Sequence, residues 1–423
     1  MKKRALALLI ATALCLAGCA GPLGLAPPPG DLPDEDRPID QGEPPVETPT
    51  LANTQIPSDT ETAIRHFSEK LLREVLTQGD ENPVISPLSA YYALAMAALG
   101  TGGETLAEFS ALLSRDPQAL AADLMHLTQN LADTGGSTAL RIGGSVWTAE
   151  DFPVNPTFQQ AMADYFDAPA HTRDFAAPET VDEINAWAAE QTEGLIDPLI
   201  ASIGRDAVML LINTLYLSAK WAEHFNPMTA YRDTFYPEGG QGVETDFLST
   251  RADSFPVTIA DHYEAALLPY DDGRLGFLLV RPTDDVSVRD FAANHDLSEI
   301  MQNLTERAEV RIRMPKLDLE YEILLNELLQ NLGLVAAFGD GADFSGISAV
   351  DEPLRISSVL QKVRLLVDEE GTEAAAATVI EIERTSLSLD LLKLNFNTPY
   401  LFAVYDLEAG IPLFVGVLDH PGR

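Results

Sequence analysis

The most constraining feature of this chain is an alternating pattern in residues 369–388, EEGTEAAAATVIEIERTSLS. From residue 372 to residue 382, every second residue is small or apolar, and Glu373, Glu381 and Glu383 stand at the positions that alternate with them. A period of two predicts a β-strand with one buried and one solvated face. The leading glycine and the alanine run favour mobility or helix over an independent strand. We therefore expect a segment that joins a sheet late, because small side chains can slide between strands that already exist.

The alternative is a strand that is permanently paired, a role that Gly371 and the alanines fit poorly. Insertion would also be unobstructed. No proline occurs between Gly371 and Pro399, and no charged residue occupies the alternating positions from Thr372 to Ile382.

The chain resembles the serpin family from about Thr60 to the C-terminus. Six blocks carry this resemblance in the family's order: NPVISPLSAYYALAMAALGTGGETLAEF (82–109), INAWAAEQTEGLIDPLI (184–200), LINTLYLSAKWAEHFNP (211–227), MPKLDLEYEILLNELLQNLGLVAAFGDGADFSGIS (314–348), ISSVLQKVRLLVDEEGTEAAAAT (356–378) and FNTPYLFAVYDLEAGIPLFVGVLDHP (396–421). The resemblance implies an α+β serpin fold, with helices packed on a large mixed central β-sheet and on smaller sheets. It also implies an exposed reactive-centre loop at about residues 369–392.

The function that the resemblance implies is suicide inhibition of serine proteases, with cysteine proteases as further targets. The protease forms a 1:1 covalent acyl-enzyme with the loop, whose N-terminal part then inserts into the central sheet and traps the protease. Such a protein is not an enzyme, needs no cofactor or metal, and is expected to be a monomer. The alternative is a non-inhibitory serpin-fold binding or chaperone-like protein. If the loop inserts more slowly than water hydrolyses the acyl-enzyme, the protease is released and the chain is only a substrate.

The resemblance also assigns the residues of the loop. The hinge comprises Glu369, Gly371, Thr372, Glu373, Ala374, Ala375, Ala376, Ala377 and Thr378. Family spacing counted from Glu369 places the scissile bond between Thr385 and Ser386. Two other bonds stay open, Arg384–Thr385 for a trypsin-like specificity pocket and Leu387–Ser388 for a chymotrypsin-like one.

Further residues match family positions that control opening of the central sheet. Ser86, Ser89 and Asn213 lie where the strands must part, and Gln361 stands where the family often has a histidine. Hydrogen bonds among these side chains could hold the sheet closed. A glutamine cannot titrate near neutral pH, so gating should respond little to pH.

Trp221, Lys316 and Glu369 match the top of the sheet, where the loop enters. We expect an ion pair between Lys316 and Glu369, worth about 0–1 kcal/mol if it is exposed.

The N-terminus predicts export. Residues 1–18 combine a basic start with a short apolar run, as in a signal peptide. The sequence Leu16-Ala17-Gly18-Cys19 resembles a bacterial lipoprotein signal, which implies a lipid on Cys19 and a membrane anchor facing the periplasm or the outside. The alternative is an ordinary secretory signal with an incidental cysteine. Residues 19–60 are rich in proline and acid and should form a disordered tether, followed by one folded domain, 61–423.

Composition and motifs exclude several function classes. The net charge of −38 argues against nucleic acid and anionic lipid as partners. This acidity fits simple solubility, and the alternative is an adaptation to a saline habitat. Motifs of hydrolases, zinc proteases and nucleotide-binding loops do not occur, and the seven histidines are scattered.

Periodicity predicts where the helices and strands lie. Helices are expected near 61–77, 87–98, 104–114, 117–132, 156–165, 180–191 and 321–333. Strands are expected near 139–148, 207–219, 264–270, 275–281, 309–320, 362–368, 399–406 and 411–418. The last two strands are apolar throughout and should form a deeply buried hairpin.

Overall fold

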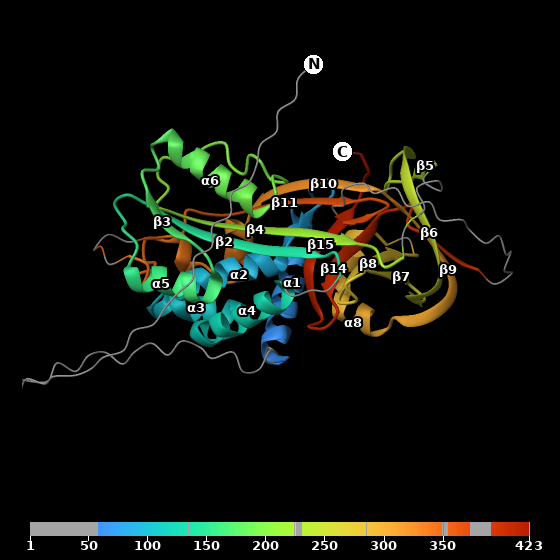
Figure 1. The fold of residues 1–423 in the computed structure, drawn as a ribbon, viewed down its shortest axis with the longest axis horizontal. Coiled ribbons are helices and arrows are strands. Elements are labelled where there is room, and N and C mark those ends of the chain that lie inside the picture. Colours follow the sequence, from blue (N-terminus) through green and yellow to red (C-terminus); the bar gives the residue numbers. More distant parts are fainter. Residues whose placement is uncertain are drawn as a thin grey trace, which may run out of the picture. The chain divides into compact units, whose positions relative to one another are not determined.

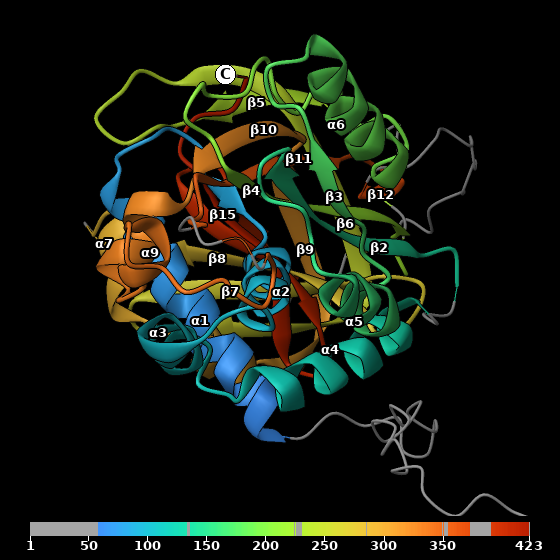
Figure 2. The same cartoon turned by 90° about the vertical axis from the view of Figure 1, so that its left-hand side faces the viewer.

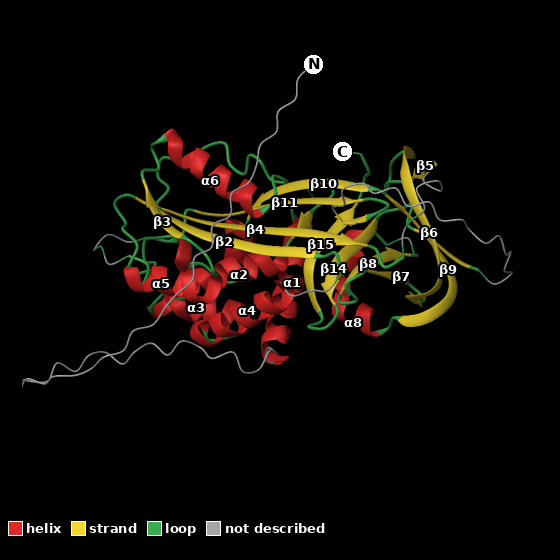
Figure 3. Ribbon diagram, in the orientation of Figure 1, coloured by secondary structure: helices red, strands yellow, loops and turns green. Residues whose placement is uncertain are grey.

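The computed structural model describes residues 58–132, 136–223, 225, 231–284, 286–348, 350, 354–372 and 391–422. Its helices are α1 (Ser58–Thr77), α2 (Pro87–Ala98), α3 (Gly103–Leu113), α4 (Pro117–Ala132), α5 (Pro156–Phe166), α6 (Pro178–Gln191), α7 (Val288–Asn294), α8 (Leu297–Gln302) and α9 (Asn326–Asn331). Most helices precede most strands along the chain. Figure 3 shows that the fold contains both helices and large sheets, so the expected α+β class is confirmed.

The strands form two sheets. The six-stranded sheet has the order β10 (Leu317–Leu324), β11 (Ser358–Val367), β12 (Gly371–Thr372), β4 (Met209–Lys220), β2 (Ala139–Ala149) and β3 (Ala170–Arg173). The nine-stranded sheet has the order β1 (Val84–Ile85), β15 (Ile411–Leu418), β14 (Tyr400–Asp406), β8 (Leu275–Pro282), β7 (Tyr263–Pro269), β6 (Val243–Ile259), β9 (Thr305–Pro315) and β13 (Leu392–Asn395), with β5 (Tyr231–Phe235) paired to β6.

Helices cover both faces of the six-stranded sheet. α6 lies on one face, and α2, α4 and α5 lie on the other (Figures 1 and 2). Each face has its own apolar cluster. A small one beneath α6 contains Trp147, Ile184 and Ile212, and a much larger one contains α2 and the buried hairpin. The sheet is therefore buried on both sides over much of its area.

Helix α2 begins with local signals that the sequence provides. Ser86 is its N-cap and accepts a hydrogen bond from the backbone N–H of Ser89, and Pro87 occupies the first turn. All twelve residues of α2 are buried. A helix that is apolar all round belongs in the interior, and here it lies directly against β4 and β2.

The predicted C-terminal hairpin is confirmed. β14 and β15 pair antiparallel, and every residue in both strands is buried.

Two predictions of local structure were wrong. The helix expected over 321–333 is only Asn326–Asn331, because residues 317–324 form β10, whose buried and exposed residues alternate along most of the strand. The single strand expected over 309–320 is two strands, β9 and β10, which belong to different sheets and meet at Lys316.

The strands β1, β3, β5, β6 and β13 and the helices α7 and α8 were not predicted. The part of the chain that the structure describes contains no helix long and apolar enough to cross a membrane.

Candidate functional site

The six-stranded sheet is split between β4 and β11. The described parts of these strands pair directly, and in parallel, over four rungs that end at Gln361 opposite Asn213. Beyond this rung the two strands keep the same register, since Val367 and Ala219 both lie opposite Thr372. Five rungs, from 362/214 to 366/218, lie between these points, and the described residues contain no direct pairing there. The split is thus an in-register gap of one strand.

Strand β12 closes one end of this split. Thr372 pairs antiparallel with Val367 on one side and with Ala219 on the other. A Cβ atom at Gly371 would lie 1.9 Å from the carbonyl oxygen of Ala219, so this close approach requires glycine. The side chain of Thr372 is buried and faces the interior. The first of the alternating positions in residues 372–382 is therefore already part of the sheet.

Two stacked aromatic rings hold β12 and the turn before it. Trp221 and Tyr270 stack with ring centroids 4.7 Å apart and an angle of 7° between the planes. The indole Nε1 of Trp221 donates to the carbonyl oxygen of Asp368 at 2.9 Å, and the Tyr270 hydroxyl lies 2.5 Å from Oγ1 of Thr372. Burial raises the pKa of Tyr270, so its hydroxyl stays protonated and able to donate.

The turn between β11 and β12 is held by polar contacts. Oδ1 of Asp368 accepts from the backbone N–H of Glu370 at 2.8 Å and of Gly371 at 3.3 Å. The predicted ion pair is present, with Nζ of Lys316 2.6 Å from Oε1 of Glu369. Their side chains are 35% and 15% exposed, so the pair is half-buried and solvent screens it less than a surface pair.

These residues surround one point, where chain segments from both sheets meet. Lys316 joins β9 of one sheet to β10 of the other, and Trp221 bridges the end of β4 to Tyr270 after β7. We call this group the hinge site and define it by seven residues: Trp221, Tyr270, Lys316, Asp368, Glu369, Gly371 and Thr372.

The other end of the split carries a buried polar cluster. Gln361 accepts at Oε1 from the backbone N–H of Ser86 at 3.1 Å. Its Nε2 donates to Ser86 O at 2.8 Å and lies 3.1 Å from Oγ of Ser89 and 3.3 Å from Oδ1 of Asn213. Ser89 also donates to Oδ1 of Asn213 at 2.9 Å. We call these four residues the central cluster.

The central cluster ties α2 to the last rung at which β4 and β11 still pair. All four side chains are at most 1% exposed. The Nδ2 atom of Asn213 has no hydrogen-bond partner within the described chain. Opening the sheet further would break these hydrogen bonds. The sequence predicted that the four residues act together, but it did not predict which atoms bond.

Sequence reasoning missed two residues of the hinge site, Tyr270 and Asp368. Tyr270 lies outside the six family blocks, and its role depends on the contact between the end of β7 and the hinge. Asp368 lies within the block 356–378, but its role depends on the contact of its carbonyl oxygen with Trp221 and on the turn geometry. Other predicted residues lie outside the described part of the chain: Glu373, Ala374, Ala375, Ala376, Ala377, Thr378, Arg384, Thr385, Ser386, Leu387, Ser388 and Cys19.

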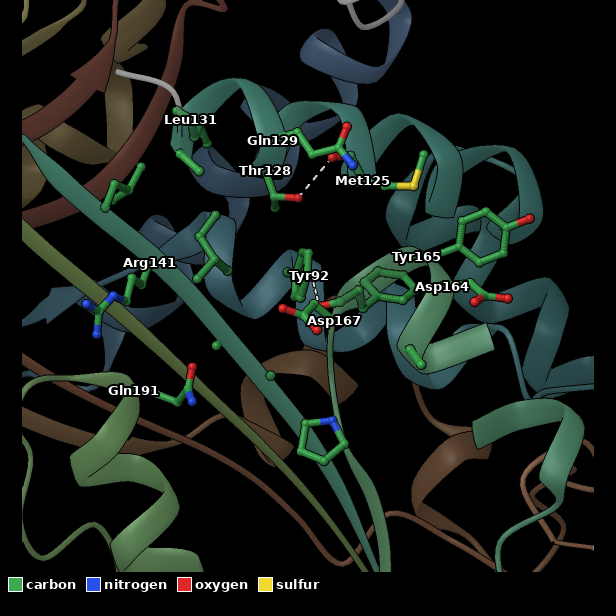
Figure 4. A pocket seen from close by; sticks show the side chains of 18 of the residues that line it. Tyr92, Met125, Thr128, Gln129, Leu131, Arg141, Asp164, Tyr165, Asp167 and Gln191 are labelled. Carbon is green, nitrogen blue, oxygen red and sulfur yellow. Dashed lines mark hydrogen bonds between the residues drawn. The ribbon is translucent and has the colours of Figure 1, made fainter. Parts of the chain in front are cut away.

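A cavity of about 550 Å³ lies away from both clusters, between α4, α5 and β2 (Figure 4). Several polar groups that line it are already paired. Arg141 forms an ion pair with Glu193, Thr128 donates to Met125 O, and the Tyr92 hydroxyl donates to Phe166 O. The cavity does not bring together the unpaired titratable groups that catalysis requires. The described residues also contain no cluster of side chains able to hold a metal ion.

Comparison with known proteins identifies the family. Residues 62–421 match the family model described as "Serpin (serine protease inhibitor)". The chain is a serpin. It is 29% identical to serine proteinase inhibitor A3K of Cavia porcellus, over 85% of this chain and 89% of that protein.

Solved serpin structures share the fold. The native state of the thermophilic serpin tengpin has a TM-score of 0.81 and 29% identity, covering 89% of this chain and 97% of that one. Human thyroxine-binding globulin, solved in complex with thyroxine, has a TM-score of 0.79 and 22% identity, covering 86% of this chain and 99% of that one. The second likeness concerns the fold alone.

Proposed function

We propose that this serpin inhibits serine proteases, and cysteine proteases as a second target class, by acting as a suicide substrate. The observation that carries the proposal is the in-register split between β4 and β11, with Thr372 at its mouth. A protease that cleaves the loop would release the chain after Thr372 to continue into this gap. The acylated protease would move with it.

The register of β12 determines where each later residue would lie after insertion. Because Thr372 is opposite Ala219 and Val367, Ala374 would enter between Leu217 and Leu365. Ala376 would enter between Leu215 and Val363, and Thr378 would meet the Asn213–Gln361 rung of the central cluster. The alternating positions from Thr372 onward would therefore face the interior.

The expected energy is large enough to drive trapping. Five residues, 373–377, would fill the gap and form about ten backbone hydrogen bonds. At a net ~1 kcal/mol each, these release on the order of 10 kcal/mol. This is comparable with the ~5–15 kcal/mol that stabilises a typical domain. Insertion of Thr378 and the residues after it would part the four remaining rungs between β4 and β11 and break the central cluster.

The test mixes the purified chain with trypsin, elastase, chymotrypsin and subtilisin in turn. A covalent band at the summed mass on a denaturing gel is the expected result. Mass spectrometry of the released C-terminal peptide would distinguish cleavage after Arg384, Thr385 and Leu387. Clean cleavage in residues 384–388 with no covalent band for any protease would favour the alternative, a non-inhibitory serpin.

Two loop variants test the insertion step itself. Ala376→Glu places a charge on the face that would be buried, so it should allow cleavage but abolish the covalent band. Ala377→Glu is the matched control on the opposite face, and it should still trap the protease. Equal behaviour of the two variants would contradict insertion in this register.

We further propose that the chain is exported and anchored by a lipid on Cys19, with residues 19–60 as a tether. The basic start, the short apolar run and the Leu-Ala-Gly-Cys sequence support this. Labelled fatty acid should be incorporated into the wild-type chain and not into Cys19→Ala. Equal labelling of both would refute the anchor.

A further inference from the structure

A basic face lies on the outer side of the sheet formed by β5, β6, β9 and β13. We define it by Tyr231, Arg311, Arg313 and Lys393. Within β9 the residues Val310, Ile312 and Met314 are buried, so the arginines between them face outward. Strand β13 runs parallel to β9, with Lys393 opposite Arg311. Paired residues project to the same side, so the two cations are neighbours on this face.

This arrangement is not explained by the needs of the fold. Like charges on neighbouring strands repel each other and do not stabilise the sheet. Acidic side chains are abundant in this chain, 65 against 27 basic ones. Even so, neither Arg311 nor Lys393 has an ion pair among the described residues.

The remaining members of the basic face are built as a contact surface. Arg313 forms an ion pair with Asp233 and lies over the Tyr231 ring, 4.9 Å from its centroid. Tyr231 is held there with 40% of its surface exposed. Arginine and tyrosine are the residue types that most often carry binding energy at protein interfaces.

The basic face lies close to the reactive bond along the chain. Lys393 follows Ser386 by seven residues, a segment that spans at most about 25 Å. A protease domain of about 220 residues is roughly 40 Å across. A protease bound at residues 384–388 is therefore large enough to reach the basic face.

We propose that the basic face docks an acidic surface of the target protease. The inference rests on the proposed function, because it names a property of the protease that the loop receives. The net charge of −38 repels an acidic protein at long range, so a local basic patch beside the loop would select and orient such a target. The same net charge disfavours nucleic acid as the occupant.

The test compares two double variants of the full chain, each of which removes two positive charges. Arg311→Gln with Lys393→Gln alters the basic face. The matched control, Lys70→Gln with Arg205→Gln, removes exposed cations on α1 and in the segment before β4. The probes are anionic and cationic trypsin. Both prefer to cleave after arginine, here Arg384, but they differ in surface charge.

The measured quantity is the second-order rate of loop cleavage plus covalent complex formation, at low and at high salt. The basic-face variant should react on the order of tenfold more slowly with anionic trypsin at low salt, and this difference should vanish at high salt. Cationic trypsin and the control variant should show changes below about twofold. The covalent yield should not change, because the hinge is intact.

Other outcomes would overturn the proposal. An unchanged rate with anionic trypsin would show that the face does not dock proteases. A faster rate would show that it holds the chain's own acidic residues 31–47 instead. Loss of retention on immobilised DNA without a change in rate would show a nucleic-acid surface. If no covalent complex forms with any variant, the proposed function fails, but the cleavage rates still decide whether the face docks the protease.

Discussion

The contact between Tyr270 and Thr372 offers the most direct test of how the hinge is held. The two hydroxyl oxygens lie 2.5 Å apart, and their side chains are at most 1% exposed. Tyr270→Phe removes one hydroxyl and keeps the ring that stacks on Trp221. Thr372→Val removes the other hydroxyl and preserves the shape of the side chain.

The expected magnitude follows from burial. Each single substitution leaves the partner hydroxyl buried without a hydrogen bond, which costs about 1–3 kcal/mol. The double variant leaves no unpaired hydroxyl, so it should be no less stable than either single variant. The coupling free energy between the two positions should therefore be about 1–2 kcal/mol.

The assay is urea unfolding followed by tryptophan fluorescence, with Trp221 reporting directly on the hinge. With a denaturant slope of about 3 kcal/mol/M, each single variant should lower the midpoint of the first transition by roughly 0.5 M. The control cycle combines Thr372→Val with Tyr91→Phe, which removes a buried hydroxyl that donates to Leu113 O at 2.8 Å. These two sites share no contact, so their effects should add. Additive effects of Tyr270→Phe and Thr372→Val would refute the claim that this hydrogen bond holds β12 in the sheet.

Three further predictions concern charge and pH. Lys316→Ala should lower the unfolding midpoint at low salt by the equivalent of about 1 kcal/mol. The charge swap Lys316→Glu with Glu369→Lys should restore the midpoint. Failure of the swap to restore it would show that the ion pair does not stabilise the hinge. Gln361→His should make the free energy of unfolding depend on pH. Burial lowers the pKa of a histidine below its value in the unfolded chain, so the unfolded state binds more protons. The folded state should therefore lose stability as the pH drops through about 6.5. A flat profile of the thermal midpoint from about pH 7.5 to 5.5 in that variant would contradict this. Burial, with a smaller contribution from Arg173, lowers the pKa of His171 in the wild-type chain. The wild-type chain should therefore lose stability as the pH falls through about 6.5. His171→Phe should remove the share of this loss that comes from His171. Identical pH profiles for wild type and His171→Phe would show that this histidine does not contribute.

The sequence carried much of the fold because its local signals agree with its tertiary environment. Ser86-Pro87 begins α2 with a cap and a proline in the first turn, and the apolar runs that end the chain become a fully buried hairpin. The prediction failed at residues 317–333, where buried and exposed residues alternate for the first six positions of a strand that precedes a short helix. The stretch fits both the two-residue period of a strand and the 3.6-residue period of a helix. Only the pairing of β10 with β11 decides which residues form the strand. Strand β6 was missed because its polar and charged residues are accommodated by pairing with β5 and β9.

The sequence by itself determined which residues can enter a sheet. The small and apolar residues at every second position from 372 to 382 are a property of the chain, and so is the absence of proline. The sequence also determined that Gln361 cannot titrate. Only the tertiary structure decided how the first of these positions, Thr372, is held in the sheet. The register that puts Thr372 between Val367 and Ala219, and the placement of Tyr270 against it, join segments about 100 to 150 residues apart. Such contacts depend on how two sheets meet at Lys316 and Trp221, and no local pattern encodes that geometry.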